Sequence, residues 1–233
     1  MKVEKTFVSG FEASIRAMRN PLDSWSKSDS HYWGFDTVLG PVEESDVECP
    51  ERPLIGPNDL ALAQRLIKNG KEHSKFTRTI NVWVDLTLPL YIWAEFDTYK
   101  VAVVRNSCST MHMLGKRALT LDDFEDGEET SLEFEHFLPL IEEINKKSFE
   151  YREKKSLGEA CKRPVGLLKK PLMSSYLQKS TIATNYAVLR GMYLHRRYHR
   201  LPEWNIKQSN TKFSICKWIE TLPYSGELIT LGK

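Results

Sequence analysis

Alternation of apolar and polar residues marks one segment of the chain most clearly. Segment 78–88 places its large aliphatic residues on one face: Ile80, Val82, Val84 and Leu86. The residues between them (Asn81, Trp83, Asp85 and Thr87) form the other face. A period of two with β-branched residues is typical of a strand that buries one side. Segment 2–8 (KVEKTFV) alternates in the same way and predicts a short strand.

Helical spacing of apolar residues marks several other segments. The predicted helices cover residues 11–19, 59–69 with Asn58 as N-cap, 89–100 opened by Pro89, 136–156, 172–199 and 211–221. Between the first two lies a stretch rich in proline and glycine, 20–57, which predicts a long loop. We expect strand 78–88 to pack against the long helix 172–199. The fold class is therefore predicted as α+β, a mainly antiparallel sheet packed with long helices, in a single domain over residues 1–233.

Composition narrows the class of protein. The chain has 233 residues, 41% hydrophobic and 27% charged, which is ordinary for one globular domain. A formal net charge of +2 does not favour a general nucleic-acid binder. Four cysteines without a C-x-x-C pair predict neither a zinc site nor a disulfide framework, and we expect no metal. The chain has no apolar run of about 20 residues and no signal-like start, so we expect a cytoplasmic protein without a membrane span.

Candidate chemistry gathers in the polar segment 97–112 (DTYKVAVVRNSCSTMH), which is dense in hydroxyl groups and carries Lys100, Asn106 and Ser109. Hydroxyls and free backbone N–H groups near a helix start, with a cation close by, suit a phosphate group. The alternative is a polar loop whose hydroxyls cap the next helix. Taken by itself, the segment leaves both interpretations open.

A second polar segment gives the first one a family context. Thr98-Tyr99-Lys100 is followed by eight residues and then Ser109; about 85 residues further on, Asn185 and Arg196 stand eleven positions apart. This pair of segments resembles the flavin-dependent thymidylate synthases, whose signature is R-H-R, seven residues and then serine. Thr98-Tyr99-Lys100 stands in the place of R-H-R. The resemblance covers about residues 1–112 and 172–206.

The resemblance implies roles for individual residues. Lys100, Asn185 and His199 correspond to cofactor-binding positions, with Arg200 as the alternative to His199 for a histidine that contacts flavin. Asn106 and Ser109 correspond to nucleotide-binding positions. Arg196 corresponds to an arginine that contacts the uracil, where it would bind nucleotide and stabilise charge on the pyrimidine during catalysis. The alternative for the sequence HRRYHR (195–200) is a solvated basic helix end, stabilised by the helix dipole.

The function implied by the resemblance is methylation of dUMP to dTMP. FAD would carry the hydride, with NADPH and methylene-tetrahydrofolate as further reactants, in a homotetramer. The arginines of R-H-R have planar guanidinium groups that can make paired hydrogen bonds, and Lys100 cannot replace them. A second hypothesis is therefore a catalytically inactive protein on the same scaffold that senses or sequesters a nucleotide. A third is nucleic-acid binding through the basic segments 162–170 and 195–200.

Overall fold

The structure is a computed structural model that describes residues 1–33, 47–125, 131–161, 165–207 and 213–232. Parts of the predicted loop 20–57, the basic segment 162–170 and the predicted helix 211–221 lie outside these residues. The chain forms two compact units. Unit 1 contains Met1, Thr87–Asp97 and Asn106–Ser180. Unit 2 contains Lys2–Leu86, Thr98–Arg105 and Thr181–Lys233.

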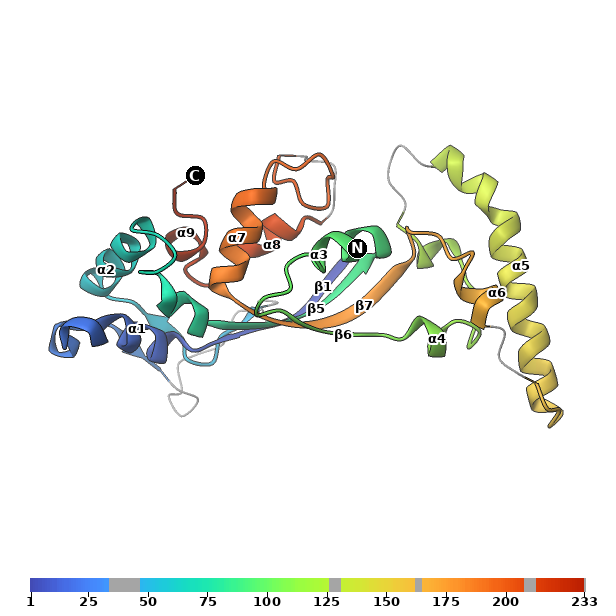
Figure 1. Cartoon of the computed structure of the whole chain (residues 1–233), viewed down its shortest axis with the longest axis horizontal. Helices are drawn as coiled ribbons and strands as arrows, with labels where there is room; N and C mark the ends of the chain where they lie inside the picture. The colour runs from blue at the N-terminus through green and yellow to red at the C-terminus, as the bar shows by residue number, and fades with distance from the viewer. Residues whose placement is uncertain (34–46, 126–130, 162–164, 208–212, 233) are drawn as a thin grey trace. The chain divides into compact units, whose positions relative to one another are not determined.

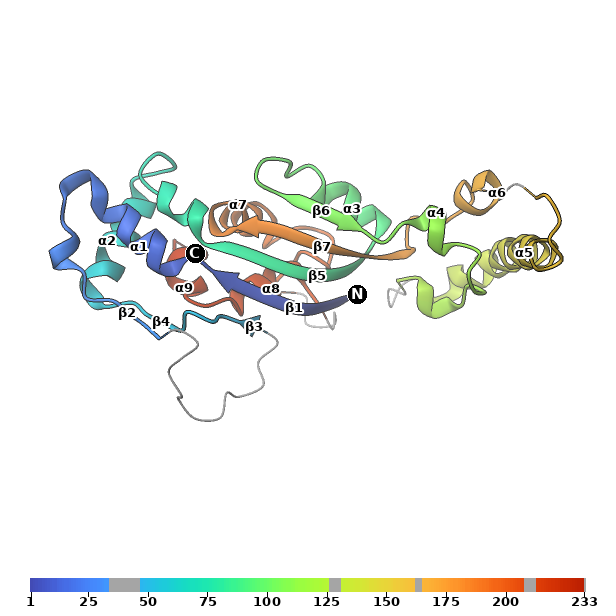
Figure 2. The ribbon, with the colours of Figure 1, turned by 90° about the horizontal axis from the view of Figure 1, so that it is seen from below.

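The larger sheet among the described residues has five strands. Its strands, in spatial order, are β3 (Val47–Glu48), β1 (Lys2–Ser9), β5 (Asn81–Pro89), β7 (Leu177–Asn185) and β6 (Val104–Ser107). Strands β1 and β3 are parallel, whereas β1, β5, β7 and β6 run in alternating directions, as Figure 2 shows. The α+β class with a mainly antiparallel sheet is thus confirmed. A separate small sheet pairs β2 (His31–Tyr32) with β4 (Pro53–Leu54).

Strand β5 confirms the alternation seen in the sequence. The side chains of Val82, Val84 and Leu86 are at most 1% exposed. On the opposite face Trp83 is 38% exposed, and its ring lies 5.6 Å from the ring of Phe7 on β1. One face of the strand therefore builds the core, while the other carries an aromatic pair that remains partly accessible to solvent.

The predicted helix 172–199 is wrong, because its first half is strand β7 and only its second half is helical, as α7 (Tyr186–Arg196). In β7 the buried residues alternate with more exposed ones as far as Thr184, but most of the buried residues are polar: Gln178, Ser180, Thr184 and Asn185. Buried polar residues conceal a period-two pattern that is read from apolar residues alone. Strand β5 accordingly pairs with β7 instead of packing its face against one long helix.

The helices of unit 2 are α1 (Phe11–Arg19), α2 (Pro57–Lys68), α7, α8 (Ile215–Glu220) and α9 (Ser225–Leu228). Helices α7 and α8 lie on the same side of the sheet (Figure 1). Short 3-10 turns connect these elements: Asn20–Leu22, Trp25–Lys27 and Lys75–Thr79. The prediction of Asn58 as N-cap is wrong. Gly56 holds that position, and the Asp29 carboxylate accepts hydrogen bonds from the backbone N–H groups of Asn58 and Asp59.

Unit 1 has its own small core. Its helices are α3 (Leu90–Phe96), α4 (Thr110–Met113), α5 (Ser131–Ser156) and α6 (Val165–Lys169), with a 3-10 turn at Leu121–Asp123. The buried cluster consists of Leu114, Leu119, Phe124, Ile141, Ile144 and Leu168. Helix α3 ends earlier than predicted, at Phe96, so that residues 98–100 lie in the turn that follows it. Among the residues that the structure describes, no helix is long and apolar enough to cross a membrane.

Candidate functional site

Arg196 is the last residue of α7, and its guanidinium group lies beside the aromatic rings of Tyr99 and Trp204 in unit 2. Its Nε donates a hydrogen bond to the Tyr99 hydroxyl at 3.2 Å, and its Nη1 lies 2.9 Å from Nε2 of His199. The side chain is half-buried. Tyr99 and Arg196 are 97 residues apart in sequence. Their contact joins the turn that replaces R-H-R to the helix end that carries the candidate uracil contact.

Two aromatic rings flank the Arg196 guanidinium group. Its central carbon lies 5.4 Å from the ring centre of Trp204 and 5.9 Å from that of Tyr99. The two rings are 6.4 Å apart, and Trp204 is fully buried. A cation within about 6 Å of a ring is attracted by the negative charge over the ring face. The rings also exclude water, which strengthens the attraction between the cation and a hydrogen-bond acceptor.

His199 is fixed beside Arg196 by the turn that follows α7. Its Nδ1 accepts a hydrogen bond from the backbone N–H of Leu201 at 3.2 Å, and its carbonyl oxygen accepts one from the Asn205 side chain at 2.6 Å. With Nε2 facing Arg196, both ring nitrogens are in contact with groups of the chain itself. The imidazole therefore belongs to the structure that holds Arg196 in place.

Asn185 lies at the opposite end of α7 from Arg196. Its Oδ1 accepts a hydrogen bond from the Val188 N–H at 3.1 Å, so the side chain caps the helix. The residue is 6% exposed. The sequence predicted Asn185 and Arg196 inside one continuous helix, but Asn185 is the residue before the helix starts. Its role in cofactor binding stays a prediction.

The remaining candidate residues divide between the two units. Lys100 is exposed in the turn after α3, which belongs to unit 2. Asn106 is an exposed residue of β6, and Ser109 is the half-buried N-cap residue of α4; both belong to unit 1. A site shared by Ser109 and Arg196 therefore stays a prediction.

Sequence analysis missed Tyr99 and Trp204 as members of the Arg196 cluster. In the sequence Tyr99 is only the middle residue of the segment that stands in the place of R-H-R, and Trp204 has no assigned role. No local pattern in the sequence marks the contact of Tyr99 with Arg196, because it depends on how the turn meets the helix.

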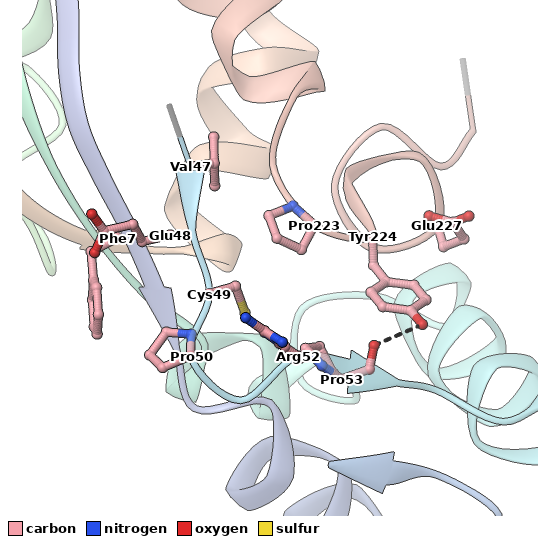
Figure 3. Close-up of a pocket in the computed structure, with 10 residues that line it drawn as sticks. All are labelled: Phe7, Val47, Glu48, Cys49, Pro50, Arg52, Pro53, Pro223, Tyr224 and Glu227. Atoms are coloured by element: carbon pink, nitrogen blue, oxygen red, sulfur yellow. Dashed lines mark hydrogen bonds between the residues drawn. The ribbon is translucent and has the colours of Figure 1, made fainter. Parts of the chain in front are cut away.

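Two cavities lie elsewhere in unit 2. The first, of about 610 Å³, is bounded by β1, β3, the turn that follows β3, and the segment 223–227 (Figure 3). The Tyr224 hydroxyl donates a hydrogen bond to the Pro53 carbonyl across this cavity at 3.2 Å. Burial and the nearby Glu51 carboxylate raise the pKa of the Cys49 thiol to about 11, so this cysteine is protonated at neutral pH and is a poor nucleophile.

The second cavity, of about 1250 Å³, lies between α1, α2 and the 3-10 turn Lys75–Thr79. Its lining combines apolar residues of α1 and α2, among them Met18 and Leu62, with basic residues such as Lys27 and Arg65. None of the residues assigned from the sequence lines either cavity. The cluster formed by Arg196, Tyr99, His199 and Trp204 therefore lies outside both cavities and is defined by contacts between these side chains.

Comparisons with known proteins concern the fold. No protein-family model and no curated protein matches the sequence. The solved structures that are similar to this chain include two of the flavin-dependent thymidylate synthase ThyX from Helicobacter pylori with FAD and dUMP. The first has a TM-score of 0.64 at 13% identity and covers 98% of both chains. The second has a TM-score of 0.63 at 14% identity and covers 98% of this chain and 97% of the other. The present chain has the fold of these enzymes from end to end.

Proposed function

We propose that the chain binds a uridine nucleotide and that Arg196 recognises its pyrimidine ring. The observation that carries the proposal is the contact between Arg196 and Tyr99. It brings together the turn 98–100 and the end of α7, two segments that the family resemblance assigns to one site. The similar structures of ThyX are described as complexes with FAD and dUMP, which supports dUMP as the nucleotide to test first.

The chemistry of the Arg196 cluster suits a pyrimidine carbonyl group. A guanidinium group is planar and permanently charged, and it donates hydrogen bonds in fixed directions. Tyr99 and His199 contact two of its nitrogens, which fixes the plane of the group. The buried ring of Trp204 beside it lowers the local polarity. A donor that is already oriented loses little conformational entropy when a ligand oxygen accepts its hydrogen bond.

Flavin fits the residues present less well than a uridine nucleotide does. Of the three side chains that the resemblance assigns to the cofactor, the Asn185 amide caps α7, and both ring nitrogens of His199 contact groups of the chain. Lys100 is exposed, but it provides a point charge where the family has arginine forks. The residues present therefore do not fit FAD well, and an inactive nucleotide-binding protein is the function that this geometry favours.

Flavin-dependent methylation of dUMP is the second candidate. The end-to-end match of the fold to ThyX favours it. Such an enzyme would use FAD, NADPH and methylene-tetrahydrofolate, assemble as a homotetramer and place Asn106 and Ser109 at the nucleotide. A visible absorption spectrum of the purified protein, followed by an assay for dTMP formation, separates this candidate from the first. Bound flavin together with dTMP formation would establish the enzyme and reject the inactive protein.

Calorimetric titration of the protein with dUMP, dTMP and FAD tests nucleotide binding directly. We expect heat with dUMP, and we expect Arg196→Ala to weaken this binding by about 1.5–3 kcal/mol, the scale of a hydrogen bond to a charged group. Arg16→Ala is the matched control, because Arg16 is an exposed arginine in the last turn of α1. Absence of heat with both nucleotides, or equal losses in the two variants, would reject the proposal.

A further inference from the structure

We propose that Tyr99 is a positioning residue that orients Arg196 toward the ligand. This role rests on the nucleotide-binding function proposed above, and it belongs to a residue that departs from the family signature. Of the three residues 98–100 that stand in place of R-H-R, Thr98 and Lys100 are exposed, whereas Tyr99 is half-buried. Tyr99 is thus the one member of the three whose side chain is partly withdrawn from solvent, and Arg196 is a group that it contacts.

Tyr99 holds the Arg196 guanidinium group at two points. Its hydroxyl oxygen accepts the hydrogen bond from Nε at 3.2 Å, and its ring centre lies 5.9 Å from the central guanidinium carbon. A bond at Nε acts on the inner edge of the planar group. It therefore restricts rotation of the plane about the end of the side chain, and so selects the direction in which the terminal N–H groups point.

Trp204 provides the fixed support for this arrangement. Its ring centre lies 5.4 Å from the guanidinium carbon, and its backbone is held on both sides. The Trp204 N–H donates to the Leu201 carbonyl at 3.2 Å, and the Trp204 carbonyl accepts from the Ser214 hydroxyl at 3.0 Å. Because Trp204 is fully buried, it cannot turn easily. Tyr99 acts against a rigid neighbour, and its hydrogen bond at Nε joins the contact of His199 at Nη1 in setting the orientation of the guanidinium group.

The chemical type of residue 99 matters for this role. A phenol hydroxyl can accept a hydrogen bond from a guanidinium N–H, and so can a neutral imidazole, whereas a phenylalanine ring offers no acceptor atom. The hydroxyl oxygen of Tyr99 is therefore the atom on which this role depends.

The test is Tyr99→Phe, which removes the hydroxyl and keeps the ring. We expect affinity for dUMP to fall roughly three- to tenfold, the effect of one net hydrogen bond. In an Arg196→Ala background the same substitution should have no further effect, since its target is absent. Tyr198→Phe is the control, because Tyr198 is 56% exposed on the same helix end and contacts Arg197 and Lys207. Thermal unfolding should show that all variants remain folded.

A spectroscopic readout separates failure of this proposal from failure of the proposed function. In protein labelled with ¹⁵N, the Nε–H resonance of Arg196 is identified by its loss in Arg196→Ala. We expect its hydrogen exchange with water to be several-fold faster in Tyr99→Phe than in the wild type and in Tyr198→Phe. Unchanged exchange in Tyr99→Phe would overturn the positioning role. A wild type that does not bind dUMP, with exchange accelerated as expected, would reject nucleotide binding and retain Tyr99 as the support of Arg196.

Discussion

Two arginines of unit 2 have opposite surroundings. Arg19, at the end of α1, is 4% exposed, and its Nε donates to Oδ1 of Asp59 at 2.5 Å. Asp59 is fully buried, and its Oδ2 accepts further hydrogen bonds from the hydroxyls of Ser28 and Ser30. Arg196, at the end of α7, is half-buried and contacts a phenol hydroxyl, an imidazole and an indole face.

The difference separates a structural arginine from a candidate recognition arginine. Asp59 also accepts from the backbone N–H groups of Asp29 and Ser30, so the Arg19 pair ties the loop before β2 to helix α2. A buried pair of this kind stabilises the fold only while both charges are present. The contacts of Arg196 with Tyr99 and Trp204 orient its charge beside aromatic rings. We therefore expect substitutions at the Arg19 pair to change stability and substitutions at Arg196 to change binding.

The largest expected effect follows from Asp59→Asn. This change leaves the buried Arg19 charge without its carboxylate, and we expect a loss of about 3–5 kcal/mol in the free energy of unfolding. Unfolding in urea, followed by circular dichroism, measures it. The control is Asp23→Asn, which alters a carboxylate that is exposed on the adjacent turn. A loss below about 1 kcal/mol, within the range of an exposed ion pair, would remove the contrast between the two arginines.

The dependence of stability on pH gives the next effect. Burial by itself would raise the pKa of Asp59, but hydrogen bonds from Ser30 and Ser28 and the Arg19 guanidinium outweigh it and hold the pKa below its ordinary value. A lowered pKa contributes stability that is present above the unfolded value of about 3.9 and lost as pH falls through the folded value. We expect unfolding scans between neutral pH and pH 3 to show a steeper acid loss for the wild type than for Asp59→Asn. Parallel curves would contradict this assignment.

The smallest expected effect is that of Arg196→Ala on stability. The substitution removes the contacts of a half-buried cation with two rings, and we expect a loss of about 1 kcal/mol. The same urea experiment measures it, so the two arginines are compared under one set of conditions. Arg196→Ala sharpens the comparison if its stability loss is small and its nucleotide affinity falls. A loss as large as that of Asp59→Asn would place Arg196 among the structural residues.

The sequence predicted those elements whose pattern arises from apolar residues alone. Helix α1 has the predicted bounds, with Phe11, Ile15 and Met18 buried, and strand β5 buries its predicted face. The prediction from the sequence was wrong at β7, where the buried polar residues Gln178 and Ser180 hide the alternation of apolar residues. There the side chains are polar, and the sheet had to be known before their burial could be inferred. The predicted N-cap of α2 was wrong for a similar reason, because the carboxylate that accepts hydrogen bonds from the start of this helix belongs to Asp29 in a distant loop.

The sequence by itself determined the fold class and the departure from R-H-R at residues 98–100, and it singled out Arg196 as a candidate. The tertiary structure decided what these residues touch. Whether Asn185 lies on a helix face or caps a helix depends on where β7 ends. The contact of Tyr99 with Arg196 depends on how the turn after α3 meets the end of α7, which is 97 residues away in the sequence. Apolar periodicity is a local property of the sequence, because a helix or strand that buries one face has apolar residues at regular spacing along that face. The surroundings of a single charge depend on contacts between distant segments, which no local pattern encodes.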